Sequence, residues 1–520
     1  MLNHGEGGDG NMFCACASMG LLGISAYKVS VEVDIDGQFP SFEIVGLPDV
    51  AVKESRDRVR SAIKNSGYEF PLGKIVVNLA PGDVKKTGPL YDLPIFVGIL
   101  IASGQTGIDS SACAFIGELS LEGEIRPVSG VLPMVLEARK LGIRSIFIPE
   151  KNAAEGAIVG GIRVYPAKTA AQVIAHLSGG KKIAPAKASD FVIPENPGFG
   201  PDFADVKGQY EAKRALEIAA AGFHNVLMIG PPGSGKSMLA KRLPSILPEM
   251  TFDEAIETTK IHSICGTLPE GIPLMTQRPF RSPHHTVSPA GLTGGGSVPR
   301  PGEISLAHNG VLFLDELPEY SRSALEVLRQ PLEEGTVTIS RAAGSLTYPC
   351  SIMLVAAMNP CPCGFYGHPS KKCTCSEGAI SRYMAKVSGP LLDRIDLHVE
   401  VMPVEFSDLT DSGRGESSAE IRARVNRARA AQLKRYKGTG IICNSMLTPA
   451  MLPKYCVMTE DAKGVLMRAF ERMGLSARGY DRILKVARTI ADLDGSETID
   501  TKHIAEALQY RSLDRKYWRN

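Results

Sequence analysis

The sequence of 520 residues lacks a hydrophobic run of membrane-spanning length. Its longest apolar stretch, residues 93–102, is shorter than the roughly 20 residues that a transmembrane helix requires. The first residues lack the basic start and apolar core of a secretory signal peptide. The eleven cysteines do not form a disulfide-like framework. We therefore expect a protein of the reducing cytoplasm that has no membrane partner.

A large excess of charge of either sign is also missing. The chain has 58 lysines and arginines against 56 acidic residues, which gives a net charge of +2. This balance argues against a uniformly basic molecule, so any surface for nucleic acid must be a local stripe. Internal repeats and low-complexity tracts are absent too. At this length we expect about three domains, each able to bury its own core.

The chain does contain a complete phosphate-binding loop. Residues 230–237 fit the pattern G-x-x-x-x-G-K-[ST] and lie between a strand-like apolar segment and a helix-like one. Its glycines let backbone N–H groups turn toward phosphate oxygens, and the helix N-terminus adds its positive dipole end. Lys236 should reach the outer phosphates, and the Ser237 hydroxyl should hold Mg²⁺. The predicted nucleotide-binding residues are Gly230, Pro231, Pro232, Gly233, Ser234, Gly235, Lys236 and Ser237.

A second apolar run, residues 311–314, ends in two acids, Asp315 and Glu316. A buried parallel strand presents the residues that follow it at the sheet edge where ligands bind. Asp315 is then placed to hold Mg²⁺, directly or through water, and Glu316 to polarise a water for attack on the terminal phosphate. The alternative is an acid pair that only caps a strand. The presence of both elements in one chain favours hydrolysis over simple binding.

Three further segments follow in the order found in AAA+ ATPases. The strand-like residues 351–358 end at Asn359, whose amide could orient the attacking water. Arg394 lies in an apolar turn beside two aspartates, and Arg478 opens an apolar-periodic helix. Each of these residues alone would fit an ordinary surface position. Together they are typical of an AAA+ core.

Three longer motifs indicate which branch of the AAA+ proteins the chain resembles. Residues 278–285 read Arg-Pro-Phe-Arg-Ser-Pro-His-His, residues 301–308 read Pro-Gly-Glu-Ile-Ser-Leu-Ala-His, and residues 391–394 read Leu-Leu-Asp-Arg. From about residue 20 to 512 the chain resembles the Mg-chelatase-like branch of AAA+ proteins, and within it the competence-associated ComM/YifB group. The resemblance implies that Asn359 is the first sensor, that Arg394 is a finger reaching a neighbouring subunit's nucleotide, and that Arg478 is the second sensor.

The resemblance also implies how such a protein works. It implies a homo-hexameric ring that forms with ATP and Mg²⁺ and hydrolyses ATP. The ring would move or remodel branched or single-stranded DNA as a helicase or translocase in natural transformation and recombination. The alternative is an ATP-dependent protein remodeller or a chelatase-like assembly factor. The chelatase reaction itself is not expected, because no tetrapyrrole site is recognisable.

Four cysteines cluster in the sequence directly after Asn359. Cys361, Cys363, Cys373 and Cys375 form the pattern C-x-C-x9-C-x-C, with glycines and a proline that allow tight turns. Four thiolates at this spacing suit tetrahedral structural Zn²⁺. Reduced, unligated loop cysteines and a redox pair are the alternatives, and His368 could replace one thiolate. We expect a zinc knuckle that braces the predicted sensor strand, with the other cysteines as unpaired thiols.

We expect an α/β multidomain fold with a helical C-terminal part. The predicted boundaries are an N-terminal extension at 1–20, an α/β domain at 21–180, a linker at 181–204, an AAA+ core at 205–412 with the cysteine insertion at 361–375, and a helical lid at 413–520 that carries Arg478 over the nucleotide. Residues 205–209 should open the core and touch the adenine.

The first α/β block resembles the Lon protease-type fold but lacks its chemistry. The Lon-type nucleophile follows a Gly-Pro pair, and here Gly88-Pro89 is followed by Leu90. The lysine expected after the Ser129-Gly130 turn is also missing. Without a nucleophile or base, acyl transfer cannot begin. We expect a non-catalytic assembly or binding domain with no protease activity.

Basic residues between the two nucleotide motifs leave two interpretations open. Their loops could line a ring pore and contact DNA phosphates, or they could brace neighbouring subunits. In the lid, the basic residues at 422–434 are expected to form a solvated face. The residues between the motifs are Arg278, Arg281, His284, His285 and Arg300.

Overall fold

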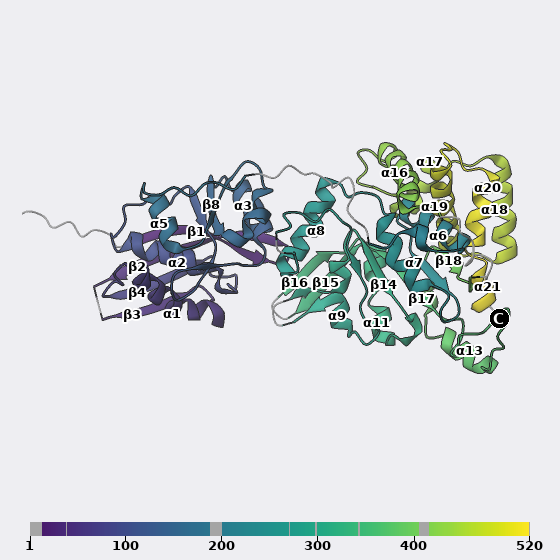
Figure 1. Ribbon diagram of the computed structural model, residues 1–520, viewed down its shortest axis with the longest axis horizontal. Coiled ribbons are helices and arrows are strands. Elements are labelled where there is room, and N and C mark those ends of the chain that lie inside the picture. Colours follow the sequence, from purple (N-terminus) through teal and green to yellow (C-terminus); the bar gives the residue numbers. More distant parts are fainter. Residues whose placement is uncertain are drawn as a thin grey trace, which may run out of the picture. The chain divides into compact units, whose positions relative to one another are not determined.

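The computed structural model describes residues 13–37, 39–187, 200–269, 271–296, 299–341, 344–404 and 415–518. It has two compact units (Figure 1). The first unit comprises Met1–Val192 and Ala255–Met275, and the second comprises Ile193–Glu254 and Thr276–Asn520. Both units combine helices with sheets, which confirms the predicted mixed α/β class.

The first unit is built on a seven-stranded mixed sheet of order β3-β4-β2-β1-β5-β8-β9. Strand β2 pairs antiparallel with β1 and β4, and the remaining pairs are parallel. Alternate residues of β4 are fully covered, as expected for a strand with one face on a core. The strands are β1 (Phe13–Leu22), β2 (Ser25–Asp36), β3 (Ser41–Val45), β4 (Lys74–Ala80), β5 (Cys113–Phe115), β8 (Ser145–Pro149) and β9 (Arg163–Ala167).

Strand β1 changes one predicted boundary. Residues 13–20, which the sequence assigned to an N-terminal extension, pair with β2 inside the sheet. The alternating burial of β1, with Cys14 and Cys16 covered, explains why this segment is part of the core. Residues 1–12 of the predicted extension and 188–199 of the predicted linker lie outside the described residues.

The longer helices of the first unit's N-terminal segment lie between its strands or after them in the sequence. They are α1 (Val50–Asn65), α2 (Asp92–Ala102), α3 (Val131–Lys140) and α5 (Ala170–Leu177). Helix α2 contains the longest apolar run of the sequence and is buried along almost its entire length. Among the described helices, none is both long enough and apolar enough to cross a membrane. The apolar run therefore has a place in a protein core.

Helix α8 (Phe252–Cys265) belongs to the first unit from Ala255 onward, although its sequence lies between the two nucleotide motifs. Ile256 packs against the apolar core of that unit. The Gly130 N–H donates to the Ser263 carbonyl at 3.0 Å, and the Ser263 hydroxyl donates to the buried Glu155 carboxylate. The structure thus differs here from the predicted continuous core at 205–412, because long-range packing gives α8 to the other unit.

The second unit contains a parallel sheet of order β11-β14-β17-β10-β18. Every residue of β10, β14 and β17 is buried, as expected when helices cover both faces of a parallel sheet. Strand β17 lies between β10 and β14, so the residues following these three strands meet at one edge. The strands are β10 (Val226–Ile229), β11 (Phe280–Arg281), β14 (Val311–Leu314), β17 (Met353–Met358) and β18 (Leu397–Glu400).

The C-terminal part of the second unit is helical and shares one apolar core with the parallel sheet. Figure 1 shows helices α18 and α20 of this part beside each other. The Ser476 hydroxyl caps α19 by accepting from the Gly479 N–H at 3.1 Å. Its principal helices are α16 (Ser418–Arg435), α18 (Glu460–Met473), α19 (Ala477–Leu493), α20 (Thr501–Gln509) and α21 (Leu513–Tyr517).

A buried polar network connects these helices to the sheet. The ring of His224, just before β10, contacts Asp396 at 3.3 Å and Thr489 of α19 at 2.8 Å. Asn444 donates to Thr489 and to Asp492, each at 2.9 Å. Buried polar groups of this kind need partners, and here they find them across the boundary between sheet and helices.

Candidate nucleotide site

The predicted phosphate-binding loop joins β10 to α7 (Lys236–Arg242). Gly233 and Gly235 have φ values of +77° and +94°, which residues other than glycine rarely adopt. A Cβ on Gly230 would lie 2.1 Å from the Val401 carbonyl oxygen. The pattern glycines are therefore required by the turn itself and by close packing against the chain after β18.

Lys236 is 8% exposed and points back into its own loop. Its Nζ donates to the carbonyl oxygens of Gly230 at 2.7 Å and Pro231 at 2.9 Å, and to Asn359 Oδ1 at 3.3 Å. Burial lowers the pKa of Lys236 to about 8, and the nearby Asp315 carboxylate only partly opposes this change. A buried cation in such a loop is suited to a polyanionic ligand.

Proton uptake should accompany nucleotide binding above pH 8. The phosphates of a bound nucleotide favour the ammonium form of Lys236, so binding near pH 9 should take up close to one proton, and affinity should fall by up to roughly tenfold per pH unit. Calorimetry in buffers of different ionisation enthalpy measures this uptake. Near pH 7 the lysine is charged in both states, so uptake should be close to zero. Absence of uptake near pH 9 would contradict the account of Lys236.

Ser237 and Asp315 are brought together from the loop and from the end of β14. Ser237 Oγ donates to Asp315 Oδ2 at 2.5 Å. A hydroxyl and a carboxylate at the edge of a nucleotide loop are the oxygen ligands that Mg²⁺ prefers. These two residues therefore fit the predicted role of holding a nucleotide-bound Mg²⁺.

Glu316 follows Asp315 with a left-handed backbone, at φ +52°. Non-glycine residues rarely adopt this conformation, which costs on the order of 1–3 kcal/mol and is found mostly at functional sites. Its N–H donates to Asp315 Oδ1 at 2.9 Å. Its carboxylate is 59% exposed and lies 3.5 Å from Nδ1 of His285. This partner could not be predicted from the sequence, because His285 follows a different strand.

Asn359 lies at the end of β17, between the phosphate loop and the acid pair, and its Oδ1 accepts the hydrogen bond from Lys236. Gln209, from the segment expected to touch the adenine, donates to the Ser234 carbonyl at 3.1 Å and the Met402 carbonyl at 2.6 Å. The structure thus places Gln209 against the phosphate loop, a contact that the sequence did not indicate.

Arg394 and Arg478 converge on one carboxylate, that of Glu333 in α12 (Arg329–Glu334). Arg394 Nη2 contacts Glu333 Oε2 directly, and Arg478 Nη2 lies 3.8 Å from Oε1. The Arg394 guanidinium holds the pKa of Glu333 below its usual value. Glu333 itself is half exposed. Arg394, expected to be the finger, and Arg478, expected to be the second sensor, are therefore neighbours, although they are far apart in the sequence.

Several basic residues considered for DNA contacts have other partners. The Arg278 side chain is buried and pairs with Glu254 at 3.1 Å, so its guanidinium already has a carboxylate partner. Arg281 forms a two-point ion pair with Glu303. In α16, Arg429 is 7% exposed and donates to the Ile442 carbonyl, so the expected solvated basic face does not include it. Arg278 and Arg281 thus pair with acids from distant positions in the sequence, and Arg429 donates to backbone carbonyls.

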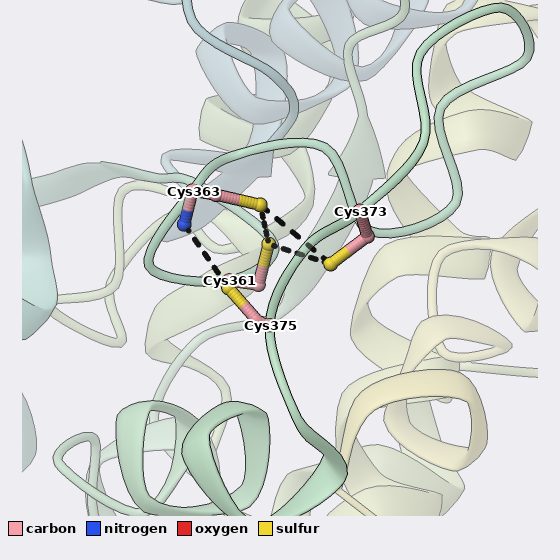
Figure 2. Close-up of side chains that lie close together, drawn as sticks. All are labelled: Cys361, Cys363, Cys373 and Cys375. Atoms are coloured by element: carbon pink, nitrogen blue, oxygen red, sulfur yellow. Dashed lines mark hydrogen bonds between the residues drawn. The ribbon is translucent and has the colours of Figure 1, made fainter.

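The four cysteines after β17 come together, as their spacing predicted (Figure 2). Cys361 Sγ lies 3.4 Å from Cys363 Sγ and 3.7 Å from Cys373 Sγ, and the last two are 3.6 Å apart. Four sulfurs around one Zn²⁺ at about 2.3 Å would be about 3.8 Å apart, close to these values. The Cys363 N–H donates to Cys375 Sγ, which completes the group. The cluster can therefore hold a thiophilic metal ion.

Family models match three parts of the chain. Residues 202–409 match magnesium chelatase, subunit ChlI, residues 31–152 match subunit ChlI of Mg-chelatase, and residues 415–511 match the C-terminal model of magnesium chelatase, subunit ChlI. These segments contain every residue of the candidate nucleotide site described above.

Curated relatives match along almost the full length. The chain is 45% identical to "Competence protein ComM" of Haemophilus influenzae over 95% of this chain and 96% of the relative. It is 44% identical to "Uncharacterized protein YifB" of Salmonella typhimurium over the same shares. A shorter match, 30% identical over 30% of this chain and 23% of the relative, is to the "Magnesium-chelatase 67 kDa subunit" of Chlorobaculum parvum.

Proposed function

Because the chain belongs to the Mg-chelatase-like ComM/YifB family, we propose that it is a ring-forming AAA+ ATPase that remodels branched or single-stranded DNA. The ATPase activity in this proposal is supported by the meeting of three strand ends in the second unit. They bring the phosphate loop, Asp315 with Glu316, and Asn359 to one edge of the sheet.

The proposed reaction is hydrolysis of the terminal phosphate of ATP. The loop binds the phosphates, with Lys236 on the outer ones. Ser237 and Asp315 would hold Mg²⁺, which would neutralise phosphate charge when bound. Glu316 takes a proton from the attacking water, and Asn359 orients that water from the neighbouring strand. Glu316 has an exposed carboxylate next to Asp315, as a base acting on water requires.

We propose that hydrolysis needs a neighbouring copy of the chain, most simply in a hexamer. Arg394 would leave Glu333 and reach the γ-phosphate bound by that copy. Its guanidinium would stabilise the charge that develops on the transferring phosphoryl group. Arg478 contacts the same Glu333 carboxylate, so we propose that both arginines leave Glu333 when the neighbouring copy binds.

DNA is the proposed substrate because a relative 45% identical over 95% of the chain bears the name of a competence protein. A protein substrate, or a chelatase-like assembly role, is the alternative that the shorter match to a magnesium-chelatase subunit keeps open. ATP hydrolysis measured with no DNA, with duplex DNA, with single strands and with a branched junction separates the two.

Single-stranded or branched DNA should raise the hydrolysis rate of the wild-type protein, because a DNA translocase hydrolyses ATP fastest when it is bound to its DNA substrate. The Lys236→Ala variant should stay inactive on every DNA. Hydrolysis that is indifferent to all four conditions but responds to a protein partner would favour the alternative.

We further propose that the α/β block at 21–180 is a non-catalytic Lon-like domain, that the helical region at 413–520 acts as a lid, and that the protein works in the cytoplasm. Supporting the first point, Leu90 is buried in the short turn Pro89–Tyr91 before α2, and its side chain offers no nucleophile. We also propose that Cys361, Cys363, Cys373 and Cys375 hold one structural Zn²⁺.

A further inference from the structure

The cysteine cluster is directly connected to the nucleotide site through β17. Asn359, which accepts from Lys236 Nζ, is separated from the first thiol of the cluster by Pro360 alone. Only two peptide bonds therefore separate Asn359 from the first thiol of the cluster.

A second connection is a packing contact between Gly364 and the phosphate loop. Gly364 lies in the left-handed region at φ +83°, and its N–H donates to the Cys361 carbonyl at 2.9 Å, which closes a tight turn. A Cβ at this position would lie 2.4 Å from Cδ and 2.8 Å from Cγ of Pro232. Pro232 is the third residue of the phosphate loop, so the turn that carries two of the thiols supports that loop from outside.

The cysteine segment, residues 361–375, also contacts the C-terminal helix α21. The Tyr366 ring contacts the Tyr517 ring of α21 at 6.3 Å. Tyr517 Oη donates to Glu400 Oε1 at 2.8 Å. Glu400 is the last residue of β18 and pairs with Ile229, which immediately precedes the phosphate loop. The cysteine segment thus lies between α21 and the phosphate loop.

The cysteine segment has few buried side chains that could stabilise its conformation. Between residues 361 and 376 only Cys361 and Gly364 are buried, and the remaining residues are exposed or partly exposed. A short loop without a core needs another source of order, such as a bound metal ion. Backbone N–H groups already point at the sulfurs, from Tyr366 to Cys361 Sγ and from Cys363 to Cys375 Sγ. Such hydrogen bonds orient thiolate ligands around a metal.

We infer that a thiophilic divalent ion, zinc by ligand type, bound by the four cysteines sets the position of the phosphate loop through Gly364 and Asn359, so that nucleotide affinity depends on metal occupancy. Metal binding replaces the protons of the thiols and involves no change of oxidation state. The inference rests on the nucleotide binding of the proposed function but not on DNA as its substrate.

The first test measures metal and nucleotide on the full-length protein. Elemental analysis should find about one zinc per chain, and Co²⁺ substitution should give the absorption bands of a tetrahedral thiolate site. Removal of zinc by a chelator should weaken the binding of a fluorescent ADP analogue by about tenfold or more, and added zinc should restore it. Unchanged ADP affinity after metal removal, or protein purified under reducing conditions without metal, would overturn the inference.

A pair of glycine variants separates the packing contact from folding of the knuckle. Gly364→Ala places a methyl group against Pro232 and should weaken ADP binding by about tenfold while the zinc content stays at one per chain. Gly367→Ala is the matched control, because Gly367 has a similar φ of +74° but its Cβ would approach only the flexible end of Lys516, at 3.8 Å. Equal effects of the two variants on ADP affinity would overturn the role of the contact.

The same measurements distinguish failure of this inference from failure of the proposed function. If zinc-loaded wild-type protein binds no nucleotide, the proposed ATPase function fails and this inference fails with it. If ADP affinity follows zinc content while DNA has no effect on hydrolysis, the metal-dependent loop stands and only the DNA substrate is rejected.

Discussion

Two inactive variants, Arg394→Ala and Lys236→Ala, are expected to regain part of their ATPase activity when they are mixed. Each variant alone should be deficient, and Arg394→Ala should lower turnover by roughly 10³–10⁵-fold, the range seen when arginine fingers are removed. In a mixed ring, an intact Arg394 of one subunit can meet an intact Lys236 of the next. Steady-state hydrolysis measured across mixing ratios should therefore pass through a maximum.

The matched control mixes Lys236→Ala with Glu316→Gln. Both of these residues act on the nucleotide of their own subunit, so such rings contain no complete site and should stay inactive at every ratio. If the Arg394→Ala mixture also stays inactive although mixed rings form, the finger assignment fails. Arg394 would then be an internal partner of Glu333, the contact that the structure already records.

The second large effect is expected at the catalytic edge itself. Glu316→Gln should retain ATP but lower turnover by roughly 10²–10⁴-fold, because the amide cannot accept the proton of the attacking water. Lys236→Ala should lose nucleotide binding, because the loop loses its buried cation. Equilibrium binding and single-turnover hydrolysis, measured on the same preparations, distinguish the two defects.

Glu319→Gln provides the control for the loss of a nearby acid. Glu319 lies in the same short turn after β14, is half exposed and pairs with Lys386 at 3.5 Å. Its replacement should change turnover little, because exposed ion pairs contribute little and the residue has no proposed part in the reaction. Wild-type turnover in Glu316→Gln would remove Glu316 from the role of base.

The local parts of the fold and site could be predicted from the sequence. The loop at 230–237 and the acids at 315–316 follow apolar segments that fold as buried strands, and the structure has strands at both places. The cysteine spacing likewise predicted a cluster that the structure confirms. These predictions succeed because the signal lies within a few consecutive residues: an apolar run, a glycine turn or a pair of thiols.

The relations between distant residues could not be predicted in the same way. Glu333 contacts both Arg394 and Arg478, and His285 lies near Glu316, because the fold brings elements that are distant in the sequence together. Arg278 lies among prolines and near a second arginine in the sequence, yet its side chain is buried and pairs with Glu254. Such pairings depend on long-range packing, for which one sequence holds no periodic or spacing signal.

The most direct test of the central claim is strand displacement from a branched DNA by the purified protein. A fluorescent strand in a three-stranded junction should be released by the wild-type protein with ATP and Mg²⁺. It should stay bound with Glu316→Gln, or when a non-hydrolysable analogue replaces ATP. Release by the wild-type protein alone is the result that the proposed motor predicts. Steady ATP hydrolysis in the presence of the junction, with no strand released, would contradict it.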